Sequence, residues 1–435
     1  MEKLVYVPMA ADIIHHGHLN IIREASKLGR VMVGLFSDKA IASYKRVPLM
    51  NYEQRKIIVE GLKGVDCVVM QDEKEYDGNL IKYKPDFLVH GSDWSSGPLN
   101  KPRERAIALM KSWGGQVIEP PYTKDISSTK LNKSLKEAGV LPHIRLAALK
   151  KALNAKPCIR GIEAHSGLSA MIVEEAAIKD NSGITQSFDF MWLSSLTDST
   201  SKGKPDIEFV DLTSRINTVN DILEVSTKPI IYDGDTGSKI PHFAMMVKRL
   251  ERLGVSAVVI EDKIGLKKNS LCEGAAAKHT QDDIEHFCEK IKAGKEAQIT
   301  NDFMIIARIE SLILGVGLDD ALKRAKAYIQ AGADGIMIHS RQKDGAEILE
   351  FCKEYNKLEN RKPLMAVPTN YPILSEDDLQ KAEINIIVYA NQLLRAAYSA
   401  MLETAESILT HKRALEADKK YIKAVDLIRL IEGNG

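Results

Sequence analysis

Short apolar runs alternate with helical patterns over the first part of this 435-residue chain. The apolar runs predict buried strands, and apolar spacings of three and four predict helices between them. Regular alternation of the two predicts an α/β fold with a parallel, doubly wound sheet of the Rossmann-like kind. Strands are expected at Leu4–Val7, Val31–Leu35, Cys67–Met70, Phe87–His90 and Val117–Ile118, and helices at Leu19–Leu28, Tyr52–Leu62 and Pro102–Trp113.

From Arg145 onward, a helical run, a turn, a short apolar strand and a polar residue recur in sequence. Eight such units over about 240 residues predict a (β/α)₈ barrel, whose active site lies at the C-terminal ends of the strands. Gly139 and Pro142 interrupt a helical pattern, so a linker is expected at 136–149 between a domain at 1–135 and a barrel at 150–435. The barrel strands are expected at Cys158–Ile162, Phe188–Met191, Pro229–Tyr232, Ala257–Ile260, Phe303–Ala307, Gly335–Ile338, Leu364–Val367 and Ile386–Tyr389.

The composition is that of a globular protein of two domains, with 44% apolar and 27% charged residues. The formal charge of +1 gives no electrostatic argument for nucleic acid or an acidic membrane as partner. No apolar run approaches the ~18–20 residues that a membrane span needs, and the first residues do not form a secretory signal. The five cysteines share no zinc or redox spacing, which favours reduced thiols and a cytoplasmic location.

Charged residues gather where the fourth barrel strand ends. The buried run Ala257–Ile260 is followed at once by Glu261, Asp262 and Lys263, and then by a loop that carries Lys267 and Asn269. Carboxylates and amines at the end of a buried strand are costly unless they are paired or bind a metal. The charge pattern alone therefore leaves two interpretations open, a salt-bridged strand end or a functional site.

Two further carboxylates follow the third barrel strand, in the sequence Asp233-Gly-Asp235. Carboxylates two residues apart at a strand end can reach one hard cation directly or through water, and Mg²⁺ usually keeps several waters. An Asx turn that caps the next helix is the alternative. Together with Glu261 on the neighbouring strand, the pattern favours a metal site.

The string Glu261-Asp-Lys, five residues, then Asn269-Ser270 resembles the signature of phosphoenolpyruvate mutase in the isocitrate lyase superfamily, and the likeness extends over 150–435. The resemblance implies Mg²⁺ held by Asp233, Asp235 and Glu261. It implies a substrate loop at Trp192, Ser194, Ser195 and Leu196, a mobile aspartate at Asp206, a gating loop with Lys267 and Asn269, and a pocket completed by Arg308 and His339. Considered singly, Trp192, Arg308 and His339 also suit packing or ion pairing inside a barrel.

The reaction implied by the resemblance is isomerisation of phosphoenolpyruvate to 3-phosphonopyruvate, with transfer of a phosphoryl group from oxygen to carbon. Asn269 favours the mutase, because an amide at that position can keep the phosphoryl group aligned while the loop excludes water. A phosphonopyruvate hydrolase and a carbon–carbon lyase of the same superfamily remain alternatives. The lyase would need a cysteine in the loop, where this chain has none before Cys272.

A second motif, His15-His16-Gly17-His18, lies between the first predicted strand and a helix start. Gly17 lets the backbone approach a phosphate, and a helix N-terminus favours anions. Imidazoles at this position can donate hydrogen bonds to phosphate oxygens as charge develops during phosphoryl transfer. A histidine-rich surface turn is the alternative for the motif taken alone.

Together with Tyr52–Arg55, Gly91–Trp94 and Ile126–Thr129, this motif resembles the glycerol-3-phosphate and ethanolamine-phosphate cytidylyltransferases. The resemblance implies that CTP and Mg²⁺ bind here. Asp12, His15 and His18 would lie near the phosphates, Lys45 or Arg46, together with Arg55, would neutralise them, and Trp94 would lie near the base. Ser127, Ser128 and Thr129 would hold phosphate. The family's phosphate-binding arginine is absent from Tyr122–Asp125, so a non-catalytic nucleotide-binding module remains the alternative.

The sequence thus predicts a bifunctional enzyme of phosphonate biosynthesis that acts on small molecules. The barrel would form the carbon–phosphorus bond, and the N-terminal domain would transfer a cytidylyl group from CTP to a phosphonate such as 2-aminoethylphosphonate. Neither nucleic acid nor a membrane is expected as a partner. The resemblance also implies a homo-oligomer, of the tetrameric kind found in the mutase family.

Overall fold

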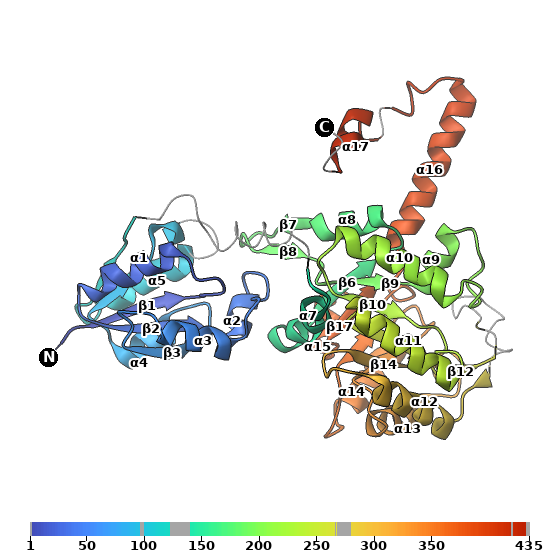
Figure 1. Cartoon of the computed structure of the whole chain (residues 1–435), viewed down its shortest axis with the longest axis horizontal. Helices are drawn as coiled ribbons and strands as arrows, with labels where there is room; N and C mark the ends of the chain where they lie inside the picture. The colour runs from blue at the N-terminus through green and yellow to red at the C-terminus, as the bar shows by residue number, and fades with distance from the viewer. Residues whose placement is uncertain are drawn as a thin grey trace.

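The computed structural model describes residues 2–95, 100–121, 140–265, 267, 280–418 and 421–431. An N-terminal parallel sheet of order β3-β2-β1-β4-β5 lies apart from a closed barrel (Figure 1). The predicted α/β fold class is therefore confirmed. The strands of the sheet are β1 (Leu4–Met9), β2 (Arg30–Phe36), β3 (Cys67–Gln71), β4 (Phe87–Val89) and β5 (Gln116–Ile118).

Helices connect the strands of this sheet, and α1 begins three residues before the position that apolar spacing predicts. It starts at His16 because His15 and His18 form a capping box, a signal that apolar periodicity does not contain. Two short helices, α2 and α4, were not predicted, since five and seven residues give little periodic signal. The helices are α1 (His16–Ser26), α2 (Asp38–Ala42), α3 (Tyr52–Glu60), α4 (Asp77–Tyr83) and α5 (Asn100–Lys111), with a 3₁₀ turn η1 (Ser92–Ser95).

All eight predicted barrel strands are present, and they close in the order β10-β11-β14-β15-β16-β17-β6-β9. Five of these strands, β6, β9, β10, β11 and β14, end one or two residues later than the apolar pattern alone indicates. Glu163, Asp233 and Glu261 are therefore the last residues of their strands, which brings their carboxylates to the C-terminal rim. The strands are β6 (Ile159–Glu163), β9 (Phe190–Leu193), β10 (Ile230–Asp233), β11 (Ala257–Glu261), β14 (Met304–Ile309), β15 (Gly335–Ile338), β16 (Leu364–Ala366) and β17 (Ile386–Tyr389).

Helices surround the barrel, and two small hairpins that the sequence analysis did not predict are added to it. These are β7–β8 (Ala177–Lys179 and Thr185–Ser187) and β12–β13 (Lys263–Ile264 and Thr280–Gln281). The helices are α8 (Gly167–Glu175), α9 (Ser195–Ser201), α10 (Leu212–Val225), α11 (Ile240–Leu253), α12 (Ile284–Ala297), α13 (Leu318–Gln330), α14 (Ala346–Tyr355), α15 (Glu376–Lys381), α16 (Gln392–His411) and α17 (Ala424–Arg429). Helix α16 projects away from the barrel (Figure 1), and none of its residues is buried.

Part of the expected linker at 136–149 is helical. Helix α7 (Pro142–Ala155) begins with its proline at the first turn, where the missing backbone N–H costs nothing. Leu149 and Ala152 pack with the apolar side chains inside the barrel. The same helix packs against α2, and the Lys151 ammonium donates a 2.7 Å hydrogen bond to the backbone carbonyl of Leu49. The helix that begins at Pro142 therefore contacts both the barrel and the N-terminal domain.

Apolar side chains fill the inside of the barrel and the layer between its strands and helices. The inner cluster includes Phe190, Trp192, Ile231, Val259 and Ile306, all buried. Polar groups are thus displaced to the strand ends, where the functional side chains lie. Within the described ranges, no helix combines the length and apolar character needed to cross a membrane.

Gly161 on β6 faces Phe190 on the paired strand β9, and its lack of a side chain makes room for that ring. A Cβ at position 161 would lie 2.2 Å from Phe190 Cε2, so Gly161→Ala should destabilise the protein by about 1–3 kcal/mol through overpacking. Urea unfolding measures this change. Gly167→Ala is the matched control, because its added Cβ would make only an ordinary contact of 3.4 Å. Equal stability of the two variants would contradict the packing argument.

Candidate active site

A pocket at the C-terminal rim of the barrel collects most of the residues predicted to act there. Because parallel strands all end at this rim, side chains far apart in the sequence meet around one cavity. The lining includes nine predicted residues, Trp192, Ser194, Ser195, Leu196, Asp206, Asp233, Lys267, Arg308 and His339. Met337, Val367, Thr369, Ala390 and Asn391 complete the lining.

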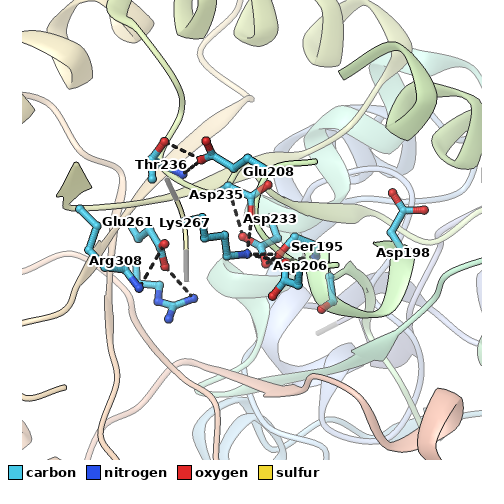
Figure 2. A network of polar contacts seen from close by, with 12 residues as sticks. Ser195, Asp198, Asp206, Glu208, Asp233, Asp235, Thr236, Glu261, Lys267 and Arg308 are labelled. Atoms are coloured by element: carbon cyan, nitrogen blue, oxygen red, sulfur yellow. Dashed lines mark hydrogen bonds and ion pairs between the residues drawn. The ribbon is translucent and has the colours of Figure 1, made fainter. Parts of the chain in front are cut away.

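Lys267 lies buried at the centre of the polar network in Figure 2. Its ammonium is 3.0 Å from an oxygen of Asp206 and also contacts the carboxylate of Asp235 and the hydroxyl of Ser195. Burial alone would lower the lysine pKa, but the carboxylates of Asp235 and Asp233 outweigh it and raise the pKa. Lys267 is thus a charged group that draws three separate loops together.

Asp233 is held by the loop after β9. Its carboxylate accepts hydrogen bonds from the Ser195 backbone N–H at 3.2 Å and from the Ser195 hydroxyl at 2.8 Å. Burial would raise the pKa of Asp233, yet the cations of Lys267 and Arg215 prevail and lower it to about 2. The carboxylate is therefore ionised at neutral pH, as a ligand for a cation must be.

Arg215 on α10 binds the same turn from the outer side. Its guanidinium donates to the backbone carbonyl of Asp233 at 2.5 Å and to the carboxylate of Asp235 at 3.1 Å. Asp235 has a left-handed backbone with φ of 55°, and its burial raises the pKa of its carboxyl group. Two cations, Arg215 and Lys267, thus hold this carboxylate between them.

Arg308, Glu310 and His339 form a second buried set on the opposite side of the pocket. The Arg308 guanidinium lies 2.5 Å from Glu310 and 3.3 Å from Glu261, and it donates to His339 Nδ1 at 3.0 Å. Burial and the nearby arginine lower the pKa of His339. A neutral imidazole that accepts at Nδ1 carries its proton on Nε2. His339 can therefore serve as a hydrogen-bond donor to a substrate.

The expected metal ligands, Asp233, Asp235 and Glu261, are not gathered into a coordination shell. In the part of the chain that the structure describes, no three His, Cys, Asp or Glu side chains are grouped closely enough to hold a metal ion. The Lys267 ammonium neutralises Asp235, while Lys263 and Arg308 lie beside Glu261 at 3.2 and 3.3 Å. Both Glu261 carboxylate oxygens are buried and accept no hydrogen bond from a described residue. Glu261 and the ionised Asp233 still offer the carboxylate oxygens that a hard cation prefers.

Side chains of the HxGH motif in the N-terminal domain are organised by the start of α1. His15 Nδ1 accepts from the Gly17 backbone N–H at 3.2 Å, and His18 Nδ1 accepts from that of His15 at 3.3 Å. Burial and neighbouring charge lower both pKa values, that of His18 to about 4. Two neutral rings, 4.0 Å apart, therefore carry their protons on Nε2.

Asp12, between β1 and the histidines, links this segment to the loop that carries Lys45 and Arg46. Its carboxylate pairs with the Arg46 guanidinium at 2.5 Å and accepts from the backbone N–H of Leu49 at 2.7 Å. The positive charge of Lys45 is near enough to lower the pKa of His18. Lys45 thus lies near His18, and Arg46 is held by Asp12.

Two residues expected at the nucleotide are structural in this fold. Arg55 is fully buried, and its guanidinium is bound to Asp38 at 2.5 Å and to the backbone carbonyls of Ala10 and Phe36. Trp94 is also fully buried, with its ring stacked on His90 at 4.1 Å and its N–H donated to Glu119. Both expectations are corrected, because these side chains bind protein groups in the interior.

Four predicted residues, Asn269, Ser127, Ser128 and Thr129, lie outside the described residues.

Sequence comparison places the barrel in a known family. Residues 149–409, more than half of the chain, match the phosphoenolpyruvate phosphomutase family. The chain belongs to this family. Residues 10–134 match the cytidylyltransferase-like family, so the mutase-family barrel follows a cytidylyltransferase-like domain.

Individual mutase-family proteins agree with this assignment. The phosphoenolpyruvate phosphomutase of Tetrahymena pyriformis is 37% identical over 283 residues, which are 65% of this chain and 89% of that protein. The crystal structure of the phosphomutase from Streptomyces platensis subsp. rosaceus has a TM-score of 0.60 and 34% identity, over 66% of this chain and 94% of that one. The crystal structure of a phosphonopyruvate hydrolase in complex with oxalate and Mg²⁺ has a TM-score of 0.58 and 33% identity, over 66% of this chain and 94% of that one.

Sequence reasoning missed Thr369, which lines the pocket, and two residues that bind its lining residues, Arg215 and Glu310. Arg215 lies on helix α10, and a charged residue on a helix is usually assigned to the solvent-facing side. Arg215 is instead buried, like its neighbours Ile216 and Val219. Glu310 follows β14 directly and lies two residues after Arg308. Side chains two residues apart in an extended chain point to the same side, so this spacing could have indicated their contact. Thr369 lines the pocket with a buried hydroxyl that has no partner among the described residues.

Protonation of His18 should destabilise the start of α1. Its folded pKa of about 4 lies below the ordinary value of 6.5, so the unfolded chain binds more protons between these values and stability is lost as pH falls through that window. We expect a loss on the order of 2 kcal/mol, measured as faster amide hydrogen exchange in His16–Ser26 after correction for the intrinsic rate. His18→Gln keeps an acceptor and does not titrate, so its exchange should depend much less on pH. An equal dependence in both proteins would disprove the assignment.

Proposed function

We propose that the barrel, residues 150–435, isomerises phosphoenolpyruvate to 3-phosphonopyruvate and so forms a carbon–phosphorus bond. The pocket lined by Ser194–Leu196, Lys267, Arg308 and His339 carries this proposal, because it offers cations and neutral donors around one small cavity. Backbone N–H groups in the Ser194–Leu196 loop would hold the carboxylate and enolate oxygens, with that of Ser195 exchanging Asp233 for the substrate. The domain before it, residues 1–135, would act separately on a nucleotide.

The chemistry asks mainly for positioning and charge stabilisation. Phosphoryl transfer passes through a loose, metaphosphate-like transition state, so little covalent assistance is needed. In our proposal Arg308 stabilises the enolate, and Arg308, His339 and Asn269 hold the phosphoryl group over the methylene carbon. Asp206 and Lys267 complete the cover that excludes water from the transferred group.

We propose Mg²⁺ as the cofactor of the barrel, with Asp233, Asp235 and Glu261 as its direct or water-mediated ligands. The ionised Asp233 supports this choice, and so do the oxygens of Glu261, which accept no hydrogen bond from a described residue although Lys263 and Arg308 lie beside them. A related phosphonopyruvate hydrolase has been crystallised with Mg²⁺ and oxalate. When bound, Mg²⁺ would supply positive charge beside the enolate oxygen.

Hydrolysis of phosphonopyruvate is the second candidate, because the hydrolase is nearly as similar to this chain as the mutase of known structure is. The two reactions differ in the fate of the phosphoryl group. A mutase returns it to the same pyruvate unit, whereas a hydrolase transfers it to water. Asn269 favours the mutase over the hydrolase. The loop sequence, which has no cysteine before Cys272, favours it over the lyases.

Wild-type protein supplied with phosphonopyruvate and Mg²⁺ should convert the phosphonate signal in ³¹P NMR into that of phosphoenolpyruvate. Asp233→Asn should lower turnover by orders of magnitude and weaken Mg²⁺ binding in calorimetry more than about tenfold. Asp235→Asn should be milder, because Arg215 and Lys267 already neutralise that carboxylate. Release of inorganic phosphate alone would establish the hydrolase, and full activity in excess chelator would exclude the metal.

For the N-terminal domain we propose CTP-dependent cytidylyl transfer to a phosphonate, with 2-aminoethylphosphonate as the acceptor and Mg²⁺ accompanying CTP. The two neutral imidazoles, His15 and His18, and the neighbouring Lys45 and Arg46 support this proposal. Arg55 and Trp94 are not among the residues that support nucleotide binding, because both side chains are buried. A module that binds nucleotide without transferring it is the alternative.

Protein incubated with CTP, Mg²⁺ and 2-aminoethylphosphonate should release pyrophosphate. His15→Ala and His18→Ala should each cost about 10²–10³ in rate, since each removes one donor aimed at developing charge. CTP binding, measured by calorimetry, should change much less. His16→Ala is the matched control, because His16 is exposed in the same turn. Absence of pyrophosphate with every amino- or hydroxyalkylphosphonate tested would leave the binding module as the function.

We also propose that the chain acts as a cytoplasmic homo-oligomer, a tetramer by family resemblance, on small-molecule substrates. The support is α16, which leaves the barrel with large apolar side chains exposed. Tyr398, Met401 and Leu409 on this helix are 65%, 63% and 77% exposed. Exposed apolar area of this kind is typical of surfaces that a second protein chain covers.

A further inference from the structure

The loop between α9 and α10 is connected to the turn that follows β10 at two places, once through Lys267 and once directly. Asp206 on this loop contacts the Lys267 ammonium, which in turn contacts Asp235. Two residues further on, one carboxylate oxygen of Glu208 accepts from the Thr236 backbone N–H at 2.9 Å and from its hydroxyl at 2.6 Å. Figure 2 shows Glu208 and Thr236 facing each other beside Asp235.

Both partners of this contact lie in constrained backbone. Glu208 has φ of 59°, a left-handed conformation that a residue with a side chain adopts at a cost in free energy. On the other side, Asp235 and Ser238 have φ of 55° and 57°. The Lys290 ammonium fixes the carbonyl of Thr236 at 2.8 Å. Such conformations persist only where surrounding contacts impose them, so the Glu208–Thr236 contact is part of what shapes both segments.

We propose that Glu208 is a positioning residue for the barrel reaction, which latches the Asp206 loop onto the Asp233–Gly237 turn. This inference rests on the proposed mutase function. The latch sets the separation between Asp206 and Asp235, and the two carboxylates then hold Lys267 from opposite sides. Glu208 itself does not line the pocket, so it acts through the residues that do.

The choice of a carboxylate fits this role. One ionised oxygen accepts two hydrogen bonds, and charge-assisted bonds of this kind are stronger than neutral ones. A loop bound through both Asp206 and Glu208 cannot rotate about either contact alone. Loss of Glu208 would leave Asp206 as a single attachment. Misplacement of a positioning group by about 1 Å can cost on the order of 10²-fold in rate.

The test compares a set of variants in the full-length protein. Glu208→Ala removes the acceptor, and we expect kcat for phosphonopyruvate isomerisation to fall on the order of 10²-fold while KM changes little. Glu208→Gln keeps an acceptor oxygen and should stay within about tenfold of wild type. Thr236→Val removes the hydroxyl donor, and combined with Glu208→Ala it should add almost no further loss. Glu224→Gln, an exposed charge on α10, is the control.

Glu208→Gly separates the side chain from the backbone, because glycine adopts the left-handed conformation without cost. Like Glu208→Ala, it should lose activity if the carboxylate is what matters. Wild-type activity in Glu208→Gly or in Glu208→Ala would overturn the proposal, and so would additive losses for Glu208→Ala and Thr236→Val.

Amide hydrogen exchange of residues 202–211 tests the latch without any turnover. Exchange there should accelerate more than about tenfold in Glu208→Ala and stay near wild type in Glu208→Gln. Unchanged exchange in both variants would disprove the latch. A wild-type protein that lacks mutase activity but shows the expected exchange would disprove the proposed function and leave the latch standing.

Discussion

Burial of charge at the barrel rim is the constraint on which the site depends. An ammonium removed from water costs several kcal/mol unless opposite charges lie close to it. Lys267 meets this requirement through Asp206 and Asp235, while Arg215 supports Asp235 from outside the barrel. The apolar interior below leaves no other place for these groups. The rim is therefore a set of mutually dependent ions. Removal of one partner leaves another charge buried without its counterion.

The fold could be predicted from the sequence because most barrel strands are short, buried apolar runs, and most have a polar residue at their end. The same reasoning could not find the hairpins β7–β8 and β12–β13, whose strands of two or three residues give no periodic signal. It also assigned part of α7 to a linker, since Pro142 reads as a helix breaker although it is favoured at a helix start.

The candidate site was predicted unevenly, and for physical reasons. Residues at the ends of strands, such as Asp233 and Arg308, could be predicted because the barrel topology fixes where strand ends lie. Arg215 was missed, since its role depends on helix packing that local sequence does not specify. Arg55 and Trp94 were placed at the nucleotide by motif position, yet burial decides their roles. A motif gives the residue type, while only the tertiary structure shows which group its side chain meets.

The same kind of hydrogen bond connects loops in both domains. A single carboxylate accepts hydrogen bonds from the backbone of a second segment: Asp12 from Leu49, Asp233 from Ser195, and Glu208 from Thr236. Strand-end loops have unpaired backbone N–H groups, and an ionised side chain satisfies these groups while fixing the loop. Each carboxylate also lies within or beside a cluster of cations. Because one group serves both purposes, the charges that would act on a phosphorylated substrate also hold the loops that would surround it.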